Sequence, residues 1–318
     1  MRRARGRKRV FTKFTITFSV RATFTAKIYK MQAGNPIESV CERGIEAADA
    51  ARPIRHVNCR IIRNYEFAPT HFIIDLELAD FGEPLMPGHF ANLKCDDKPY
   101  GMLYRPLSVM EWDRSTRILT IYYKVVGVGT EWLTRQGVDT VLKAVLPLGN
   151  SFGVPDTAKK AVMVAGGVGV APLIFLSNRL RIERPELPVL FLMGARTMDD
   201  LCLQLFRQYS IDAEFATDDG SYGHRGLVTE LLAGEFDTDG QIYLACCGPT
   251  PMMAAVKRLV PSDVIAEASL EARMACGIGA CMGCVAKIGQ RKSVDGSFTY
   301  STVCHDGPIF PLHRVIFD

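Results

Sequence analysis

The chain has no uninterrupted apolar stretch long enough to cross a membrane. No run of about 18 uncharged apolar residues occurs among its 318 residues, so we expect no membrane-spanning helix. A usable secretory signal is missing too, because Arg21, Lys27 and Lys30 interrupt the apolar residues near the N-terminus. Ten cysteines without an export signal favour the cytoplasm, a reducing compartment in which thiols can serve as metal ligands.

Acidic residues are absent from the first 30 positions, which divides the charge of the chain into two parts. The formal net charge is +4, but ten of the 38 Lys and Arg residues precede Met31, leaving 28 basic against 34 acidic residues. Like charges in residues 1–9 repel one another, so we expect residues 1–54 to be a basic, disordered extension. A start at Met31, a degenerate twin-arginine export signal and a nucleic-acid-binding tail are alternatives. The acidic body gives no reason to expect nucleic acid as a partner.

Catalytic groups built from side chains are also missing, since nothing resembles a catalytic triad or a paired-carboxylate site. What the chain does have is a set of four cysteines near its C-terminus: Cys276, Cys281, Cys284 and Cys304. Three follow the pattern C-x4-C-x2-C and the fourth comes after a longer gap, which is the spacing of plant-type [2Fe–2S] ligands. Glycines between the ligands would let the backbone bend closely around a cluster.

Two other uses of these cysteines are open. Structural zinc also takes four thiolates, and cysteines can pair in disulfides. Zinc ribbons usually repeat C-x2-C twice, whereas the first gap here is four residues and the last pair is split by a long segment. The pattern therefore favours a [2Fe–2S] cluster over zinc or disulfides.

The sequence between positions 55 and 152 predicts a closed antiparallel barrel. Six short alternating segments read as strands, at residues 59–65, 71–77, 89–94, 103–111, 118–125 and 140–145. Two polar motifs fall among them, Arg105-Pro106-Leu107-Ser108 and Tyr122-Tyr123-Lys124, the latter leading into Gly127-Val128-Gly129-Thr130. An arginine can bind a phosphate through two of its N–H groups, and glycines let backbone N–H groups approach a pyrophosphate. The motifs suit FAD, although each alone is typical of an ordinary turn.

After a predicted linker at residues 146–152, the pattern changes to that of a parallel α/β domain over residues 153–265. Strands are predicted at 161–165, 189–194, 213–217 and 241–246, and helices at 199–208, 227–232 and 251–259. The first strand leads through Gly166-Gly167-Val168-Gly169-Val170-Ala171-Pro172 into a helix that ends near residue 180. This order suits a dinucleotide pyrophosphate, but the glycines do not form G-x-G-x-x-G, so a tight turn without a ligand is the alternative.

Polar residues follow three of these strands at their carboxyl ends, where α/β sheets bind ligands. The NAD contacts predicted from this edge and from the glycine turn are Gly166, Gly167, Gly169, Pro172, Arg196, Asp218, Cys247, Gly248 and Pro249. Cys247 would lie near the nicotinamide or be an ordinary buried cysteine. Arg196 could meet a 2′-phosphate, which leaves NAD and NADP both open. Residues 266–318 complete the chain as a small [2Fe–2S] lobe.

Together these motifs resemble the electron-transfer subunit of heterotetrameric dihydroorotate dehydrogenase, in the ferredoxin-reductase superfamily. Residues 269–284 carry the most specific part of the resemblance, with Leu148-Gly149-Asn150 and residues 303–310 adding to it. The resemblance implies FAD contacts at Arg105, Pro106, Leu107, Ser108, Tyr122, Tyr123, Lys124, Gly129 and Thr130, and cluster ligands at the four cysteines. Leu107 stands where the family commonly has isoleucine. The extension at residues 1–54 has no counterpart in the family.

The resemblance also implies a function and a partner. Electrons would pass from dihydroorotate to FMN in a separate catalytic subunit, then through [2Fe–2S] and FAD to NAD+, in de novo pyrimidine (UMP) biosynthesis. Two copies of each subunit would form the heterotetramer. Three rivals are an NAD(P)H-dependent flavin iron–sulfur reductase subunit serving ferredoxin, sulfide or sulfite chemistry, a zinc-bearing adaptor, and a nucleic-acid-binding protein that uses the basic tail.

Overall fold

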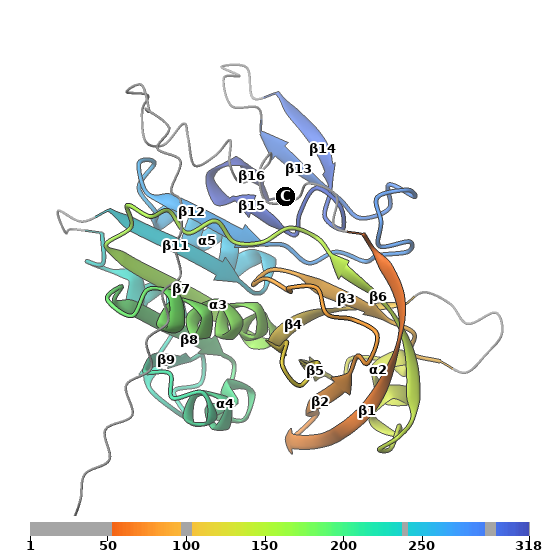
Figure 1. The fold of residues 1–318 in the computed structure, drawn as a ribbon. Coiled ribbons are helices and arrows are strands. Elements are labelled where there is room, and N and C mark those ends of the chain that lie inside the picture. The colour runs from red at the N-terminus through yellow and green to blue at the C-terminus, as the bar shows by residue number, and fades with distance from the viewer. Residues whose placement is uncertain (1–52, 97–103, 237–240, 290–296, 318) are drawn as a thin grey trace, which may run out of the picture. The chain divides into compact units, whose positions relative to one another are not determined.

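The structure is a computed structural model that describes residues 53–96, 104–236, 241–289 and 297–317 (Figure 1). The extension predicted at residues 1–54 falls almost entirely outside these ranges. Within them, no helix combines the length and the apolar character needed to cross a membrane.

The first part of the described chain is the predicted six-stranded antiparallel barrel, which the structure confirms. Its strands close in the order β1-β2-β5-β4-β3-β6. They are β1 (Arg55–Ala68), β2 (His71–Glu77), β3 (Phe90–Leu93), β4 (Arg105–Asp113), β5 (Ile118–Lys124) and β6 (Val141–Leu148). Strand alternation decides which side chains enter the barrel: Ala91 and Leu93 of β3 pack in its core, while Phe90 belongs to a different cluster outside it.

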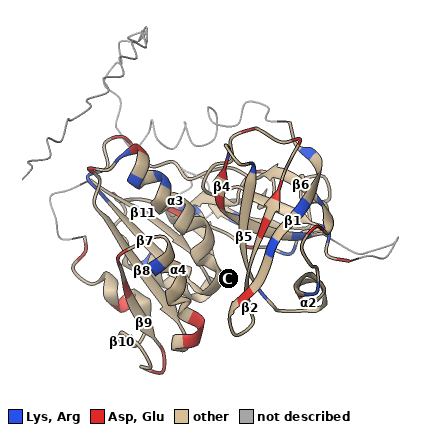
Figure 2. Ribbon diagram, turned by 60° about the horizontal axis from the view of Figure 1, so that its bottom comes forward, with Lys and Arg blue, Asp and Glu red and all other residues tan. Residues whose placement is uncertain are grey.

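Two details of the barrel differ from the prediction. Strand β6 continues to Leu148, so the first residues of the predicted linker 146–152 are still strand. The segment predicted as a glycine-rich turn begins a short helix, α2 (Val128–Thr134), directly after Gly127. Acidic and basic residues are interspersed along the barrel strands (Figure 2). Arg60, for example, forms ion pairs with both Glu77 and Asp139.

The second part is a seven-stranded sheet in the order β10-β9-β8-β7-β11-β12-β15. Its strands are β7 (Lys160–Gly166), β8 (Val189–Ala195), β9 (Ala213–Thr217), β10 (His224–Arg225), β11 (Ile242–Cys247), β12 (Ile265–Ser269) and β15 (Ile309–Pro311). All neighbours run parallel except β12 and β15. Strands such as β7 and β11 are continuous apolar runs because both of their faces are buried.

Helices cover both faces of this sheet. Helices α3 (Val170–Glu183) and α4 (Leu203–Gln208) contribute to the cluster on one face, and α5 (Thr250–Leu259) contributes to the cluster on the other. Two predicted helices take other forms. The segment 199–208 is a 3-10 turn, Met198–Leu201, separated from α4 by Cys202 in the left-handed conformation. The segment 227–232 is a 3-10 helix, Val228–Leu232.

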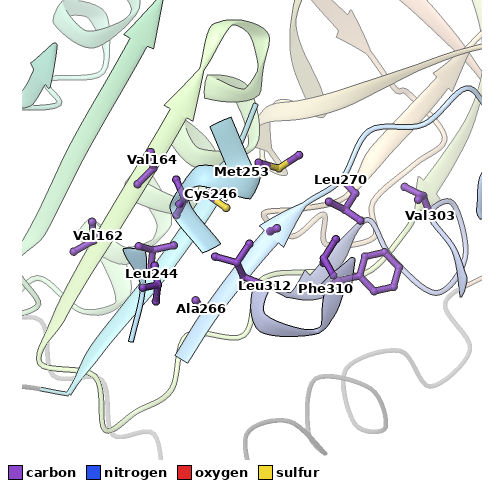
Figure 3. Packing of buried hydrophobic residues seen from close by; sticks show 14 of the residues in the cluster. Val162, Val164, Leu244, Cys246, Met253, Ala266, Leu270, Val303, Phe310 and Leu312 are labelled. Carbon is purple, nitrogen blue, oxygen red and sulfur yellow. The ribbon is translucent and has the colours of Figure 1, made fainter. Parts of the chain in front are cut away.

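The C-terminal part joins the edge of this sheet. Strands β13 (Val285–Gly289), β14 (Phe298–Thr302) and β16 (Val315–Ile316) form a small antiparallel sheet in the order β14-β13-β16. Strand β15, between β14 and β16 in sequence, pairs with β12 instead. The buried cluster of Val164 and Cys246 therefore continues through Leu270 and Phe310 to Val303 (Figure 3).

Candidate functional site

Backbone hydrogen bonds link the segments that carry the four predicted cluster ligands in the C-terminal part. The backbone N–H of Cys281 donates to the sulfur of Cys276 at 3.4 Å, and the N–H of Cys304 donates to the sulfur of Cys284 at 3.4 Å. Gly279 links these two pairs, because its N–H donates to the sulfur of Cys304 at 3.1 Å. The long gap before the fourth cysteine thus closes in space.

The loop between the ligands depends on glycine. Gly277 and Gly279 have φ values of +74° and +81°, a region that side chains disfavour. This conformation turns backbone N–H groups toward sulfur. The N–H of Ile278 is the main reason why the pKa of the Cys276 thiol falls to about 7, with the N–H of Cys281 adding to it. Burial instead raises the pKa of Cys304 to about 12.

The donor set fits a binuclear cluster. Among the residues that the structure describes, no three or more His, Cys, Asp or Glu side chains are grouped so as to hold a metal ion. Backbone hydrogen bonds instead link the cysteines in two pairs, Cys281 to the sulfur of Cys276 and Cys304 to the sulfur of Cys284. Two thiolates on each of two irons is how four cysteines hold a [2Fe–2S] cluster.

The two predicted FAD motifs of the barrel meet at Arg105. Its guanidinium group lies against Gly129, because a Cβ on that glycine would be 2.7 Å from Nε of Arg105. On β4, Pro106 pairs with Asn92 of β3 and Ser108 pairs with Phe90. Paired residues share a face of a sheet, so Pro106 and Ser108 face outward from the barrel. Arg105 pairs with Leu93 of the barrel core, so it leaves β4 on the other face, where its guanidinium group and Gly129 form a cradle with the chemistry that a phosphate requires.

Thr130 fixes the turn that precedes α2. Its hydroxyl oxygen accepts hydrogen bonds from the N–H groups of Val126 at 3.0 Å and Gly127 at 3.3 Å, and it donates to the carbonyl of Gly127 at 3.0 Å. The hydroxyl is therefore occupied within its own turn. Thr130 shapes the backbone at Gly129 and does not point its hydroxyl outward.

The side chains of Tyr122, Tyr123 and Lys124 all have protein partners. The two tyrosines point to opposite faces of β5: Tyr123 lies in the barrel core and donates to Oδ1 of Asn64 at 2.9 Å. Lys124 Nζ lies 2.5 Å from Oδ1 of Asp200. These three side chains therefore do not converge on one surface, and the segment would meet a flavin mainly with its backbone.

Tyr122 belongs to a polar group at the contact between barrel and sheet that sequence reasoning missed. Its hydroxyl lies 3.3 Å from the sulfur of Cys202, and that sulfur lies 3.0 Å from Nδ1 of His71. Asp200 approaches Nε2 of His71 at 3.6 Å and also binds Lys124. We call these five residues the interdomain network. A histidine that opens an apolar strand, and a cysteine in the middle of a predicted helix, were the available signals.

Burial decides the protonation of this network. It raises the pKa of Cys202 to about 11 and lowers the pKa of His71 from its ordinary 6.5. Both groups are therefore neutral at pH 7, and the network is held by hydrogen bonds apart from the ion pair of Lys124 and Asp200. Since Cys202 is 1% exposed and His71 is 2% exposed, these bonds form away from competing water.

The predicted dinucleotide turn follows β7 closely. Gly166 ends the strand, Gly167–Gly169 form a 3-10 turn, and α3 begins at Val170 with Pro172 buried in its first turn. At Gly169 a Cβ would come within 2.3 Å of the carbonyl oxygen of Cys247. Gly167 has φ +54° and no neighbour within 4 Å of a Cβ position, so this glycine leaves one side of the turn open.

The remaining predicted NAD residues share the edge of the sheet at this turn. Cys247 pairs in register with Ala165, so Gly248 and Pro249 follow β11 beside the turn, and a Cβ on Gly248 would lie 3.0 Å from Gly166. The N–H of Asp218 donates to the carbonyl of Ala195 at 3.1 Å, which sets Asp218 beside Arg196. Cys247 itself is buried, 2% exposed, with a pKa well above its ordinary value because of burial.

One buried amide lies between the barrel motifs and the cluster loop. Asn92 is 1% exposed and its Oδ1 has no hydrogen-bond partner. A Cβ on Gly277 would lie 2.0 Å from Nδ2 of Asn92, so the amide rests directly on the loop that follows Cys276. An orphaned buried acceptor on the face of β3 and β4 that carries Pro106 and Ser108 is what a pocket for FAD would contain.

Comparison with known proteins places two parts of the chain in described families. Residues 271–316 match the iron-sulfur cluster binding domain of dihydroorotate dehydrogenase B, and residues 163–258 match the oxidoreductase NAD-binding domain. Among solved structures, the NADH-dependent reduced ferredoxin-NADP oxidoreductase aligns with a TM-score of 0.69 at 25% identity, over 84% of this chain and 91% of that one. Phthalate dioxygenase reductase shares the fold, with a TM-score of 0.55 at 19% identity over 78% and 76% of the two chains.

Curated relatives extend the match to most of the chain. The dihydroorotate dehydrogenase B (NAD(+)) electron transfer subunit of Desulforamulus reducens is 34% identical over 82% of this chain and 98% of its own length. The corresponding homolog of Aquifex aeolicus is 32% identical over 83% and 99%. The chain is an oxidoreductase subunit whose cofactors are FAD, [2Fe–2S] and NAD. It belongs to the family of dihydroorotate dehydrogenase B (NAD(+)) electron transfer subunits.

Proposed function

We propose that this chain passes electrons between the FMN of a dihydroorotate dehydrogenase catalytic subunit and NAD+, in pyrimidine biosynthesis. The observation that carries the proposal is the contact between the loop of cluster cysteines and the barrel strands, made through Gly277 and Asn92. FAD exchanges a hydride with nicotinamide, and a [2Fe–2S] cluster moves single electrons, so a chain that holds both converts one into the other. The protein supplies position and electrostatics.

For the cluster we propose Cys276, Cys281, Cys284 and Cys304 as ligands. The N–H groups that point at their sulfurs would stabilise the negative charge of the bound thiolates. For FAD we propose Arg105 on phosphate, the backbone of Gly129 beside it, and the hydroxyl of Ser108 at the flavin. The other proposed FAD contacts are Pro106, Leu107, Tyr122, Tyr123, Lys124 and Thr130, of which the tyrosines and Lys124 would contribute backbone atoms.

For NAD we propose the sheet edge and the turn after β7, where the positive end of α3 can receive a pyrophosphate. The proposed contacts are Gly166, Gly167, Gly169, Pro172, Arg196, Asp218, Cys247, Gly248 and Pro249. Gly167 supports this assignment because its side of the turn is open. Cys247 would lie behind the nicotinamide pocket, since its thiol is buried.

We propose one domain for each of the three cofactors. Residues 55–152 would hold FAD, residues 153–265 would bind NAD, and residues 266–318 would hold the cluster. The last of these also contributes β15 and all of β12 except Ile265 to the seven-stranded sheet. Thiolate ligands that must stay reduced suit the cytoplasm. The basic extension at residues 1–54 has no part in the proposed electron path.

The partner would be the FMN-containing catalytic subunit, in a heterotetramer of two of each. Ile278 and Met282, on the loop of cluster cysteines, are exposed at 45% and 56%. Apolar side chains exposed beside a redox centre are typical of a protein interface, and docking there would bring FMN close to the cluster.

The decisive experiment is purification of the untagged partner with this chain, followed by an assay of dihydroorotate oxidation coupled to NAD+ reduction. An FMN-binding partner and coupled turnover are expected. Recovery of a ferredoxin, or of a sulfide or sulfite-reducing subunit, would replace the proposal by the alternative flavin iron–sulfur reductase. A protein that contains no flavin after gentle purification would overturn the whole assignment.

A further inference from the structure

Asn92 is a polar residue in an otherwise apolar strand. Strand β3 consists of Phe90, Ala91, Asn92 and Leu93, all of which are buried. Ala91 and Leu93 pack in the barrel core, so Asn92 lies with Phe90 on the opposite, outward face. A leucine of nearly the same shape would fill such a position without burying polar atoms. Packing alone therefore does not explain why an asparagine occupies this position.

The two neighbours of Asn92 belong to two different cofactor sites. Across the sheet it pairs with Pro106, in the motif proposed to contact FAD. On its other side its Nδ2 atom rests on Gly277, which follows the cluster ligand Cys276, so closely that a Cβ there would be 2.0 Å away. Leu148, at the end of β6, also approaches Gly277, with Cδ1 3.4 Å from the same position. One side chain thus lies between the Arg105–Ser108 motif of β4 and the cluster loop.

The carbonyl oxygen of this amide lacks a donor. Oδ1 of Asn92 is fully buried without a hydrogen-bond partner, one of three such side-chain atoms within the described ranges. A buried acceptor that loses its bonds to water and gains none in the protein destabilises the fold. The cost is offset if a bound molecule supplies an N–H or O–H at this point. The proposed function places one such molecule, FAD, on this face of β3 and β4.

We propose that Asn92 couples the flavin to the cluster loop, with Oδ1 accepting a hydrogen bond from an N–H or O–H of the flavin half of FAD and Nδ2 packed on Gly277. This inference rests on the proposed function and adds to it a residue that positions the two cofactors relative to each other. Asn92 is a positioning residue for electron transfer between them and takes no part in hydride transfer.

The test compares Asn92→Leu with Asn64→Leu. Asn64 is the matched control, because it is also a barrel asparagine but all its partners are protein groups: Leu133, Gln136 and Tyr123. Flavin-free protein is titrated with FAD by flavin fluorescence, and melting temperatures are measured with and without FAD. Asn92→Leu should weaken FAD binding about tenfold, the effect of losing one hydrogen bond. It should leave the melting temperature of the flavin-free protein unchanged or raised, while lowering that of the FAD-loaded protein.

Asn64→Leu should instead lower both melting temperatures. Should the leucine at position 92 disturb folding, Asn92→Ala provides the same comparison of FAD affinities in a smaller side chain. Rapid mixing with NADH adds a second readout: flavin bleaching should keep its wild-type rate, and the rise of the reduced-cluster EPR signal should slow about tenfold.

The inference fails if Asn92→Leu lowers the melting temperature of flavin-free protein as much as that of loaded protein and leaves FAD affinity unchanged. In that case the amide serves the fold alone, while the proposed function stands. Wild-type protein that binds no FAD at all would overturn the proposed function, and this inference with it.

Discussion

Asn150 and Ile309 form a reciprocal pair of hydrogen bonds between the end of the barrel and the C-terminal part. Nδ2 of Asn150 donates to the carbonyl of Ile309 at 2.9 Å, and Oδ1 accepts the N–H of Ile309 at 2.8 Å. The N–H of Asn150 also donates to Gly307 at 2.7 Å. Next to this joint a Cβ on Gly149 would come within 2.4 Å of Pro308. The joint fixes the segment after Cys304 against the barrel.

Replacing Asn150 by alanine should therefore loosen the cluster region. Three backbone groups lose a side-chain partner: the N–H and the carbonyl of Ile309, both part-buried, and the carbonyl of Asp306. We therefore expect a loss of about 1–3 kcal/mol in unfolding free energy. Iron content should fall with it. Denaturant unfolding and iron analysis measure the two effects. Asn58→Ala, on the exposed face of β1, should change stability by less than about 0.5 kcal/mol, and equal effects of the two variants would contradict the role of the joint.

The sequence predicts most of the fold because its signals are local. Strand alternation places all six barrel strands, and β2 and β9 begin and end where the pattern predicts. The predicted helix over 199–208 is interrupted because Cys202 turns into the left-handed conformation, where its sulfur meets His71 and Tyr122 from the barrel. A contact between residues 131 positions apart has no signature in a local pattern.

Local sequence patterns likewise predict some parts of the candidate site and not others. Cysteine spacing and glycine turns identify the cluster loop and the dinucleotide edge, because the residues that define each of them lie close together in the sequence. The pairing of β15 with β12 and the placement of Asn92 on Gly277 depend on how distant segments pack. The polar residue within the apolar run of β3 is the one sequence signal that could have drawn attention to Asn92.

Cluster ligation is tested by serine substitutions. Each of Cys276→Ser, Cys281→Ser, Cys284→Ser and Cys304→Ser should reduce bound iron from about two atoms per chain to a minor fraction, because a [2Fe–2S] cluster needs four ligands. Iron analysis and visible absorption measure the loss. Cys246→Ala is the control, since this buried thiol lies in the sheet, and should keep its iron. Full iron content in any of the four ligand variants would remove that cysteine from the site.

The FAD cradle is tested by paired changes on its two sides. Arg105→Gln removes the guanidinium group, and Gly129→Ala adds a Cβ that would lie 2.7 Å from Nε of Arg105 and displace it. Each should weaken FAD binding at least tenfold, since a charge-assisted contact to phosphate is lost or misplaced. Fluorescence titration of flavin-free protein measures the affinity. Arg60→Gln, which breaks only two exposed ion pairs, should bind FAD normally. Normal binding by the first two variants would place FAD elsewhere.

The dinucleotide turn is tested at Gly169. An alanine there would bring its Cβ within 2.3 Å of the carbonyl oxygen of Cys247, so the turn must shift away from β11. We expect KM for NADH to rise at least tenfold and stability to fall by about 1–3 kcal/mol. Dye reduction driven by NADH measures the former. Gly82→Ala, where no atom lies within 4 Å of the new Cβ, should behave as wild type; an unchanged KM in Gly169→Ala would move NAD away from this turn.

The interdomain network should make stability depend on pH. Burial, with Lys124 nearby, lowers the pKa of His71 below its ordinary 6.5, against the opposing effects of Asp200 and Glu66. The folded protein therefore binds this proton less readily than the unfolded chain does. The stabilisation is fully present above pH 6.5 and is lost as the pH falls from there toward the lowered pKa. Melting temperatures between pH 7.5 and pH 5 should fall more steeply for wild type than for His71→Gln; parallel curves would show that His71 does not titrate in this way.

The most direct test of the electron path is anaerobic titration of the purified chain with NADH, followed by visible absorption and EPR. Flavin absorption should bleach, and a reduced [2Fe–2S] signal should grow to about one spin per chain, because electrons reach the cluster through FAD in the same protein. Bleached flavin with no cluster signal, or a protein that contains neither chromophore, would contradict the account.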